Sequence, residues 1–194
     1  MNHRSLLTLT LTLFTAMVAA AQSSTWTIDK NHSQANFQIR HLAVSNVRGS
    51  ISGVTGTIIW DEKEISKSSV TAVLDANTVN TSTEARDKHL KGADFFNVDK
   101  FPTILFKSTS VTGTPGTLKI VGDLTLAGVT KSVVLDVDGP SAPVKGSSGK
   151  MITGFSATGL IKRSDFNFAI AYAGSAGLGD EVKFTLDLEA AKQP

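Results

Sequence analysis

Cysteine is absent from this chain of 194 residues. The absence excludes disulfides, thiolate metal sites, a thiol nucleophile and a lipid-modified N-terminal cysteine. Exported proteins often use disulfides but do not require them. The fold must therefore be stabilised by its hydrophobic core and its backbone hydrogen bonds alone.

An excess of charge of one sign is also missing. The chain has 19 Lys and Arg residues against 17 Asp and Glu residues, which gives a formal net charge of +2. This balance predicts no nucleic-acid partner and no polybasic patch for binding a membrane, because both need concentrated positive charge.

Catalytic signatures are equally scarce. The sequence has no G-x-S-x-G nucleophile elbow, no HExxH zinc motif, no P-loop and no correctly spaced dinucleotide fingerprint. We therefore predict a binding protein with no catalytic residues, no metal and no resident cofactor. The alternative is a metal-dependent enzyme, in which the fold brings together His32, His41 and His89 with Asp29 or Asp87.

Long apolar runs are limited to one, at residues 6–18, where only threonines interrupt it. Arg4 precedes this run, and three alanines at residues 19–21 follow it. This is the layout of a secretory signal peptide, and the run is too short for a transmembrane helix. We predict that residues 1–21 are removed, that residues 22–194 form one domain without an integral membrane segment, and that this domain lies in the periplasm. The alternative is a retained N-terminal anchor.

Alternation of apolar and polar residues dominates the rest of the chain and predicts strands. The expected strands centre on residues 26–28, 35–41, 58–60, 70–74, 104–106, 118–126, 133–137, 155–161 and 182–188. Strands that alternate in this way bury one face and expose the other, which is typical of a sandwich or a barrel. The expected fold class is therefore all-β.

Residues 81–92 interrupt the alternation and predict one short helix. Thr81 and Glu84 have the spacing of a capping box. Residues 85–91 follow as a mostly polar helix, and Gly92 is suited to the left-handed residue that ends it. Two phenylalanines come soon afterwards, so we expect the helix to lie across one end of the β-structure.

Several segments spread over the chain are characteristic in their order and spacing. They are residues 28–33 (IDKNHS), 37–41 (FQIRH), 53–56 (GVTG), 86–90 (RDKHL), 94–97 (DFFN), 101–104 (FPTI), 122–126 (GDLTL) and 161–166 (IKRSDF). With them the sequence resembles the YceI-like family of exported, lipocalin-like proteins. One departure is Asn167, where the family usually has glycine. Asn is the residue that best replaces glycine at positive φ.

The resemblance implies an eight-stranded antiparallel, lipocalin-like β-barrel with a short helix near one end. It also implies an elongated interior pocket for a polyisoprenoid, such as a quinone or a prenyl lipid. Such a ligand is compatible with the physics, because eight strands can close around one small ligand.

Apolar residues on inward-facing strand phases, together with those around the helix, are the candidate lipid contacts. They are Phe37, Ile39, Trp60, Leu90, Phe95, Phe96, Phe106 and Phe155. The alternative is that these residues only pack a filled core, because large apolar residues are buried in any fold.

Polar residues near the expected opening are the candidate head-group contacts. They are His41, Arg86, Asp87 and His89. Guanidinium geometry suits a phosphorylated head group. The alternatives are a solvated helix face with local ion pairs and, for His41, a buried histidine with a satisfied hydrogen bond. Arg163 and Asp165 are expected to bond backbone groups at a structural corner.

The expected function is the binding or carriage of one long apolar lipid in the barrel interior, with that lipid as the partner. Besides the metal-dependent enzyme, the alternatives include a stress-related scaffold that binds another protein, since a fold alone does not determine function. Homodimerisation through the barrel walls or loops is left open.

Overall fold

Alternating apolar and polar residues form eleven strands in the computed structural model, which describes residues 23–172 and 177–194. The strands are β1 (Ser23–Ile28), β2 (Gln34–His41), β3 (Ser45–Ser52), β4 (Thr55–Asp61), β5 (Ser69–Asp75), β6 (Thr103–Thr114), β7 (Thr117–Leu126), β8 (Val129–Asp138), β9 (Val144–Lys145), β10 (Met151–Lys162) and β11 (Leu178–Lys192). The helices are α1 (Glu84–Lys91) and the 3₁₀ turns η1 (Ile65–Lys67), η2 (Ala76–Thr78), η3 (Arg163–Phe166) and η4 (Ile170–Tyr172). The predicted signal peptide, residues 1–21, lies outside the described residues.

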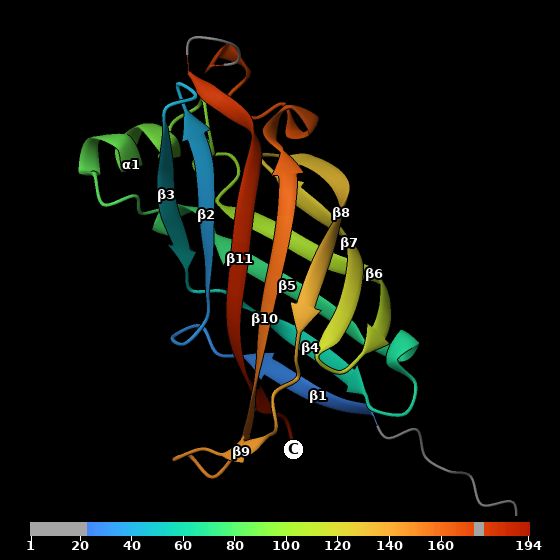
Figure 1. Ribbon diagram of the computed structural model, residues 1–194. Coiled ribbons are helices and arrows are strands. Elements are labelled where there is room, and N and C mark those ends of the chain that lie inside the picture. The colour runs from blue at the N-terminus through green and yellow to red at the C-terminus, as the bar shows by residue number, and fades with distance from the viewer. Residues whose placement is uncertain (1–22, 173–176) are drawn as a thin grey trace, which may run out of the picture.

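Eight of these strands close into an antiparallel barrel, which confirms the predicted fold class (Figure 1). Around the ring they follow the order β1, β4, β5, β6, β7, β8, β10 and β11, and β11 pairs with β1 to close it. Strand β11 is 15 residues long, so its edge has room for two partners. It pairs with β2 along Leu178–Asp187 and with β1 at Ala190–Lys192. The β2–β3 hairpin thereby extends the wall beside the first half of β11.

The inner face of the barrel takes every second residue of its strands, as the alternation predicts. In β8, Val133, Leu135 and Val137 are buried, while Val134 and Asp136 point outward and are exposed. The same pattern in the other strands produces one hydrophobic cluster inside the ring.

Three glycines hold phenylalanine rings flat against the inner wall. A Cβ added at Gly159 would lie 2.3 Å from Phe184 Cζ, and one at Gly122 would lie 2.4 Å from Phe106 Cζ. Gly49 has the same relation to the Phe37 ring. Because each ring occupies the space of a missing side chain, it extends along the wall rather than across the barrel. This arrangement keeps the interior hollow.

Helix α1 lies at one end of the barrel, as predicted, but it does not begin with the predicted capping box (Figure 1). Its N-cap is Thr83, whose side chain makes no capping hydrogen bond. Thr81 is bonded to the side chains of Asp87 and Arg86 instead. Gly92 ends the helix with φ of −70°, outside the left-handed region. No helix in the described ranges is long and apolar enough to cross a bilayer.

A corner after β10 depends on a buried arginine and a left-handed residue. The Arg163 guanidinium donates hydrogen bonds to the carbonyl oxygens of Phe168, Ala169, Leu178 and Gly179, at 2.7–3.2 Å. It therefore bonds backbone groups, as predicted.

Asn167 follows at φ of 52°, which confirms that asparagine supports the turn where the family usually has glycine. Asp165 is exposed and makes no hydrogen bond among the described contacts, so its predicted role was wrong. The carboxylate of Asp180 bonds the amide and hydroxyl of Ser164 in its place.

Candidate functional site

The barrel encloses an apolar cavity of about 600 Å³. Side chains from β2 through β8, β10 and β11 line its wall, and α1 with the segment after it contributes at one end. This volume lies within the range of about 300–1,000 Å³ that is usual for small-molecule pockets. The barrel interior is therefore hollow enough to hold a ligand, and mostly aliphatic and aromatic side chains surround that space.

All eight predicted lipid-contact residues line this cavity. They are Phe37, Ile39, Trp60, Leu90, Phe95, Phe96, Phe106 and Phe155. The Trp60 and Phe155 rings pack edge to face, with centroids 6.3 Å apart. The cavity thus has the predicted lining, while contact of these side chains with a lipid stays a prediction.

Five aromatic side chains gather where α1 and the turns η3 and η4 meet one end of the barrel. We call this end the mouth. His89 and Tyr172 each have a ring centroid 4.9 Å from that of Phe95. Phe168 packs against Phe96 at 5.0 Å and against Phe95 at 6.0 Å. The Tyr172 hydroxyl lies 3.1 Å from His89 Nε2. These contacts fix α1 to the turns across the mouth.

Tyr172 brings a titratable hydroxyl to the mouth. Burial raises its pKa, and the carboxylate of Asp94, 3.4 Å from the hydroxyl, raises it further. The hydroxyl is therefore neutral at physiological pH and can donate a hydrogen bond. The sequence interpretation missed Tyr172 and Phe168, because neither lies on a strand with a readable phase.

Of the four predicted head-group residues, His41, Arg86 and His89 line the cavity and Asp87 does not. The Asp87 carboxylate accepts hydrogen bonds from the Thr81 amide and hydroxyl. Arg86 donates from Nε to the Thr81 hydroxyl and from one terminal nitrogen to the Thr81 carbonyl. Asp87 thus holds the segment before the helix, and Arg86 shares that task while bordering the cavity.

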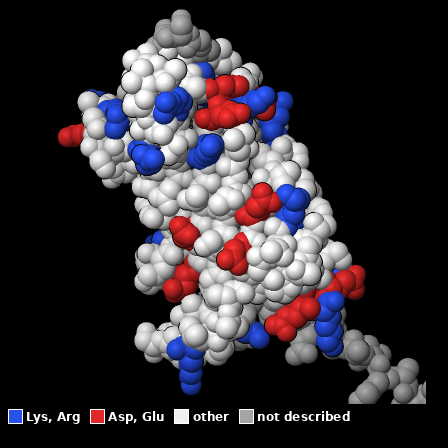
Figure 2. Space-filling model, viewed as in Figure 1, with Lys and Arg blue, Asp and Glu red and all other residues white. Residues whose placement is uncertain are grey.

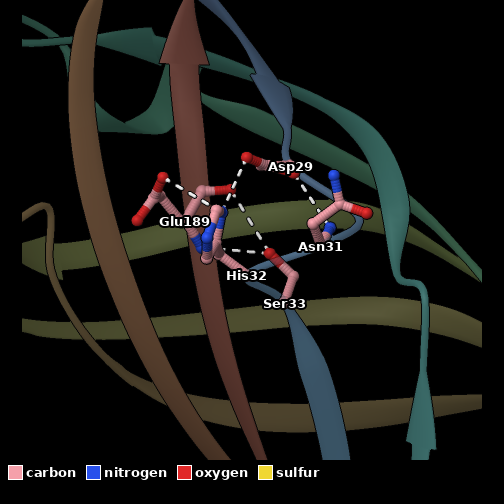
Figure 3. A network of polar contacts seen from close by, with 5 residues as sticks. All are labelled: Asp29, Asn31, His32, Ser33 and Glu189. Carbon is pink, nitrogen blue, oxygen red and sulfur yellow. Dashed lines mark hydrogen bonds and ion pairs between the residues drawn. The ribbon is translucent and has the colours of Figure 1, made fainter. Parts of the chain in front are cut away.

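The histidines do not converge on one site. His41 and His89 line the cavity, whereas His32 lies outside that lining, on the loop between β1 and β2. Figure 3 shows His32 between Asp29 and Glu189. The predicted alternative of a three-histidine metal site is therefore wrong.

The Asp29–His32–Glu189 group is tightly tied to the backbone. His32 Nδ1 lies 2.9 Å from Asp29 Oδ2 and 3.7 Å from Glu189 Oε1. The Asp29 amide donates to the Glu189 carbonyl, and the Ser33 hydroxyl accepts from the Glu189 amide. The hydrogen bond to Asp29, followed by the charges of Glu189 and Asp29, raises the pKa of His32.

The hydrogen bond between His32 and Asp29, together with a second one from the Asn31 amide, lowers the pKa of Asp29. The potential ligand atoms of the three side chains lie within 4.8 Å of one another, a spacing that a divalent cation could bridge. A protonated His32 donates its Nδ1 hydrogen bond to Asp29 and attracts the Glu189 carboxylate by charge, so the three side chains form an ion-paired clasp between the loop and β11.

These features define the class of protein: a closed antiparallel β-barrel with an apolar interior cavity and an aromatic, helix-covered mouth. The chain belongs to the YceI-like family, since the model of the YceI-like domain matches residues 26–190.

Comparison with individual proteins agrees with this assignment. The UPF0312 protein SA2479 of Staphylococcus aureus is 37% identical over 167 residues, which is 84% of this chain and 95% of that protein. The crystal structure of a Campylobacter jejuni YceI protein superposes with a TM-score of 0.70 at 33% identity, over 78% of this chain and 88% of that one. A polyisoprenoid binding domain from Saccharophagus degradans shares the fold, with a TM-score of 0.62 at 16% identity, over 87% of this chain and 98% of that one.

Proposed function

We propose that this protein binds one long apolar lipid, of the polyisoprenoid or quinone class, inside its barrel and carries it through water. The observation that carries the proposal is the apolar cavity of about 600 Å³ in a closed barrel. The fold that the chain shares with the polyisoprenoid binding domain is consistent with it. We place this activity in the periplasm, on the strength of the signal peptide predicted at residues 1–21.

Burial of the lipid tail would supply most of the binding free energy. Each methylene transferred from water to an apolar site contributes about 0.8 kcal/mol. This term depends on the length of the tail and barely on its chemistry, so selectivity must come from the mouth. His41, Arg86 and His89 border the cavity and offer hydrogen-bond donors to a polar head.

The arrangement of polar groups supports binding rather than catalysis. A hydroxyl nucleophile needs a base within hydrogen-bond reach. Among the described residues, no serine or threonine hydroxyl is hydrogen-bonded to a histidine, and His89 is bonded to a tyrosine. Arg163, the cationic side chain most deeply buried at the cavity, donates to backbone carbonyls. The lining therefore resembles that of a ligand-binding pocket.

Native mass spectrometry of protein purified from its own periplasm, followed by solvent extraction, tests the proposal. We expect a stoichiometric adduct that dissociates as an apolar lipid with an isoprenoid fragmentation pattern. The stripped protein should then rebind ubiquinone or a polyprenol from detergent solution. A protein that is empty as isolated and stays empty after incubation with both lipids would refute the proposal.

A further inference from the structure

Three exposed apolar side chains surround the mouth of the barrel. They are Leu42 and Val44 in the turn between β2 and β3, and Ile170 in η4, with 49%, 78% and 53% of their surfaces exposed. Scattered apolar residues are normal on protein surfaces, so exposure alone carries no argument. The position of these three side chains is more informative, because two separate segments of the chain bring them to the same opening.

A chain of contacts joins the two segments. The Leu42 amide donates a hydrogen bond of 2.7 Å to the Gly177 carbonyl. Gly177 in turn approaches Tyr172, since a Cβ added there would lie 3.0 Å from the Tyr172 carbonyl oxygen. Tyr172 and Ile170 belong to the same 3₁₀ turn, and Tyr172 lines the cavity together with His41. Figure 1 shows the β2–β3 turn at the barrel end that carries α1.

The turn holds its apolar residues in an unfavourable backbone conformation. Leu42 and Ala43 have φ of 50° and 55°, in the left-handed region. Hairpin turns of this kind favour Asn, Asp and Gly, and a left-handed residue with a larger side chain costs about 1–2 kcal/mol. A sequence selected only for turn formation would place a polar residue at Leu42. The leucine there indicates that the tip has a use for an apolar side chain.

Basic side chains accompany the apolar tips. Figure 2 shows Lys and Arg at the same end of the molecule, with Asp and Glu side chains among them. Arg40, Arg48 and Lys162 are exposed on the strands that lead to this end, and Lys88 is exposed on α1. None of them takes part in an ion pair among the described residues. Acidic side chains lie near two of them, because Glu181 is opposite Lys162 in the β10–β11 pairing and Glu84 precedes Lys88 by one turn of α1.

We propose that the mouth docks on an anionic phospholipid surface. Leu42, Val44 and Ile170 enter the boundary between head groups and acyl chains, and the surrounding Lys and Arg contact lipid phosphates. The proposal rests on the proposed function, which requires that a water-insoluble ligand pass between bilayer and cavity. Docking at the mouth places the opening against the bilayer, so the tail moves between two apolar environments.

Co-sedimentation of the protein with phospholipid vesicles tests the docking step. We expect binding to vesicles of phosphatidylglycerol and phosphatidylcholine, weaker binding in high salt, and little binding to phosphatidylcholine alone. The double variant Leu42→Asp, Val44→Asp should weaken binding at least 10-fold, because two buried apolar contacts are lost and two negative charges are added. Asp tolerates the left-handed backbone at position 42, so the turn is retained.

The matched control is Val134→Asp, at a residue of the barrel wall with 46% of its surface exposed. This variant should bind vesicles with no more than about a 2-fold loss, since one added charge acts weakly away from the contact. Equal losses in both variants, or wild-type protein that ignores anionic vesicles, would overturn the proposal. So would concentration-dependent dimerisation that disappears in the double variant, because a second copy would then occupy this surface.

Uptake of ubiquinone from detergent solution separates the two proposals. The double variant should retain this uptake, because none of its changes touches the cavity lining. Failure of the wild type to bind ubiquinone or a polyprenol would count against the proposed function, whereas failure at vesicles alone would count only against docking.

Discussion

Filling the cavity from within should weaken lipid binding without unfolding the barrel, and Leu186→Trp is the substitution best suited to the purpose. Leu186 lines the cavity from β11. Its neighbours across the two strand pairings are Ala157 and Ala35, which leave room beside it. A larger ring at this position enters empty space, so overpacking should be avoided and the loss of stability should stay below about 1.5 kcal/mol.

The magnitude follows from the atoms added. The indolylmethyl side chain of tryptophan, in place of the isobutyl side chain of leucine, adds about six non-hydrogen atoms to the cavity. If half of them displace the bound tail, about three methylenes return to water at about 0.8 kcal/mol each, which weakens the Kd roughly 60-fold.

The assay is titration of the stripped protein with ubiquinone in detergent solution, with Thr185→Trp as the control. Thr185 is exposed on the outer face of the same strand, and its substitution should leave the Kd unchanged. An unchanged Kd for Leu186→Trp, with tryptophan fluorescence showing a buried indole, would refute the assignment of this cavity as the tail site. A loss of equal size in both variants would point to a general effect on the protein.

Three further predictions concern stability, and thermal unfolding measures each. Because the pKa of His32 is raised, the ion-paired clasp of Asp29, His32 and Glu189 contributes fully to the stability of the fold below about pH 6.5, and its contribution falls as pH rises through the raised pKa. Because the pKa of Asp29 is lowered, the clasp persists until the pH falls below about 4. The difference in Tm between wild type and His32→Ala should therefore be largest near pH 5 and shrink above pH 7, and a difference independent of pH would contradict this. Asn167→Gly should be nearly neutral and Asn167→Val should cost about 1–2 kcal/mol, because only the second opposes a left-handed residue; equal stability of the two would be inconsistent with the strained corner. Gly159→Ala should destabilise the fold by about 1–3 kcal/mol. Gly154→Ala on the same strand should change stability by less than about 0.5 kcal/mol, because a Cβ there has its nearest neighbour at 3.4 Å. The reverse order would contradict the conclusion that Gly159 leaves space for the Phe184 ring.

The strands of the barrel were largely predictable because burial on one face imposes a period of two on the sequence. Strand β3 was missed, since Ser, Asn, Arg and Gly dilute the alternation of Val47 and Ile51. The closure of the barrel through β11 could not be predicted from the alternation of apolar and polar residues, because this alternation reveals strands but not which strands pair. Resemblance to the YceI-like family supplied the barrel topology.

The cavity wall was predictable from strand phase, and the mouth was predictable only in part. Phe184 shares the inward phase of Leu186 and could have been named with the other lining residues. Tyr172 lies in a 3₁₀ turn whose direction depends on tertiary contacts. The capping box failed because Asp87, six residues away, competes for the Thr81 hydroxyl, and a local motif cannot reveal that competitor.

The pairing of β11 with β1 has a consequence for how the chain folds. Lys192 lies opposite Trp26, so closing the ring joins segments that are more than 160 residues apart. Such contacts require most of the chain to be ordered before they form, and folding slows as the mean sequence separation of contacts grows. We expect the meander β4–β8 to form early and the seam at β11 to form last. Hydrogen–deuterium exchange during refolding should then protect β6 and β7 before β1. Because the pairing of β11 with β1 completes the cavity wall, its formation would also set the rate at which the refolding protein becomes able to bind a ligand.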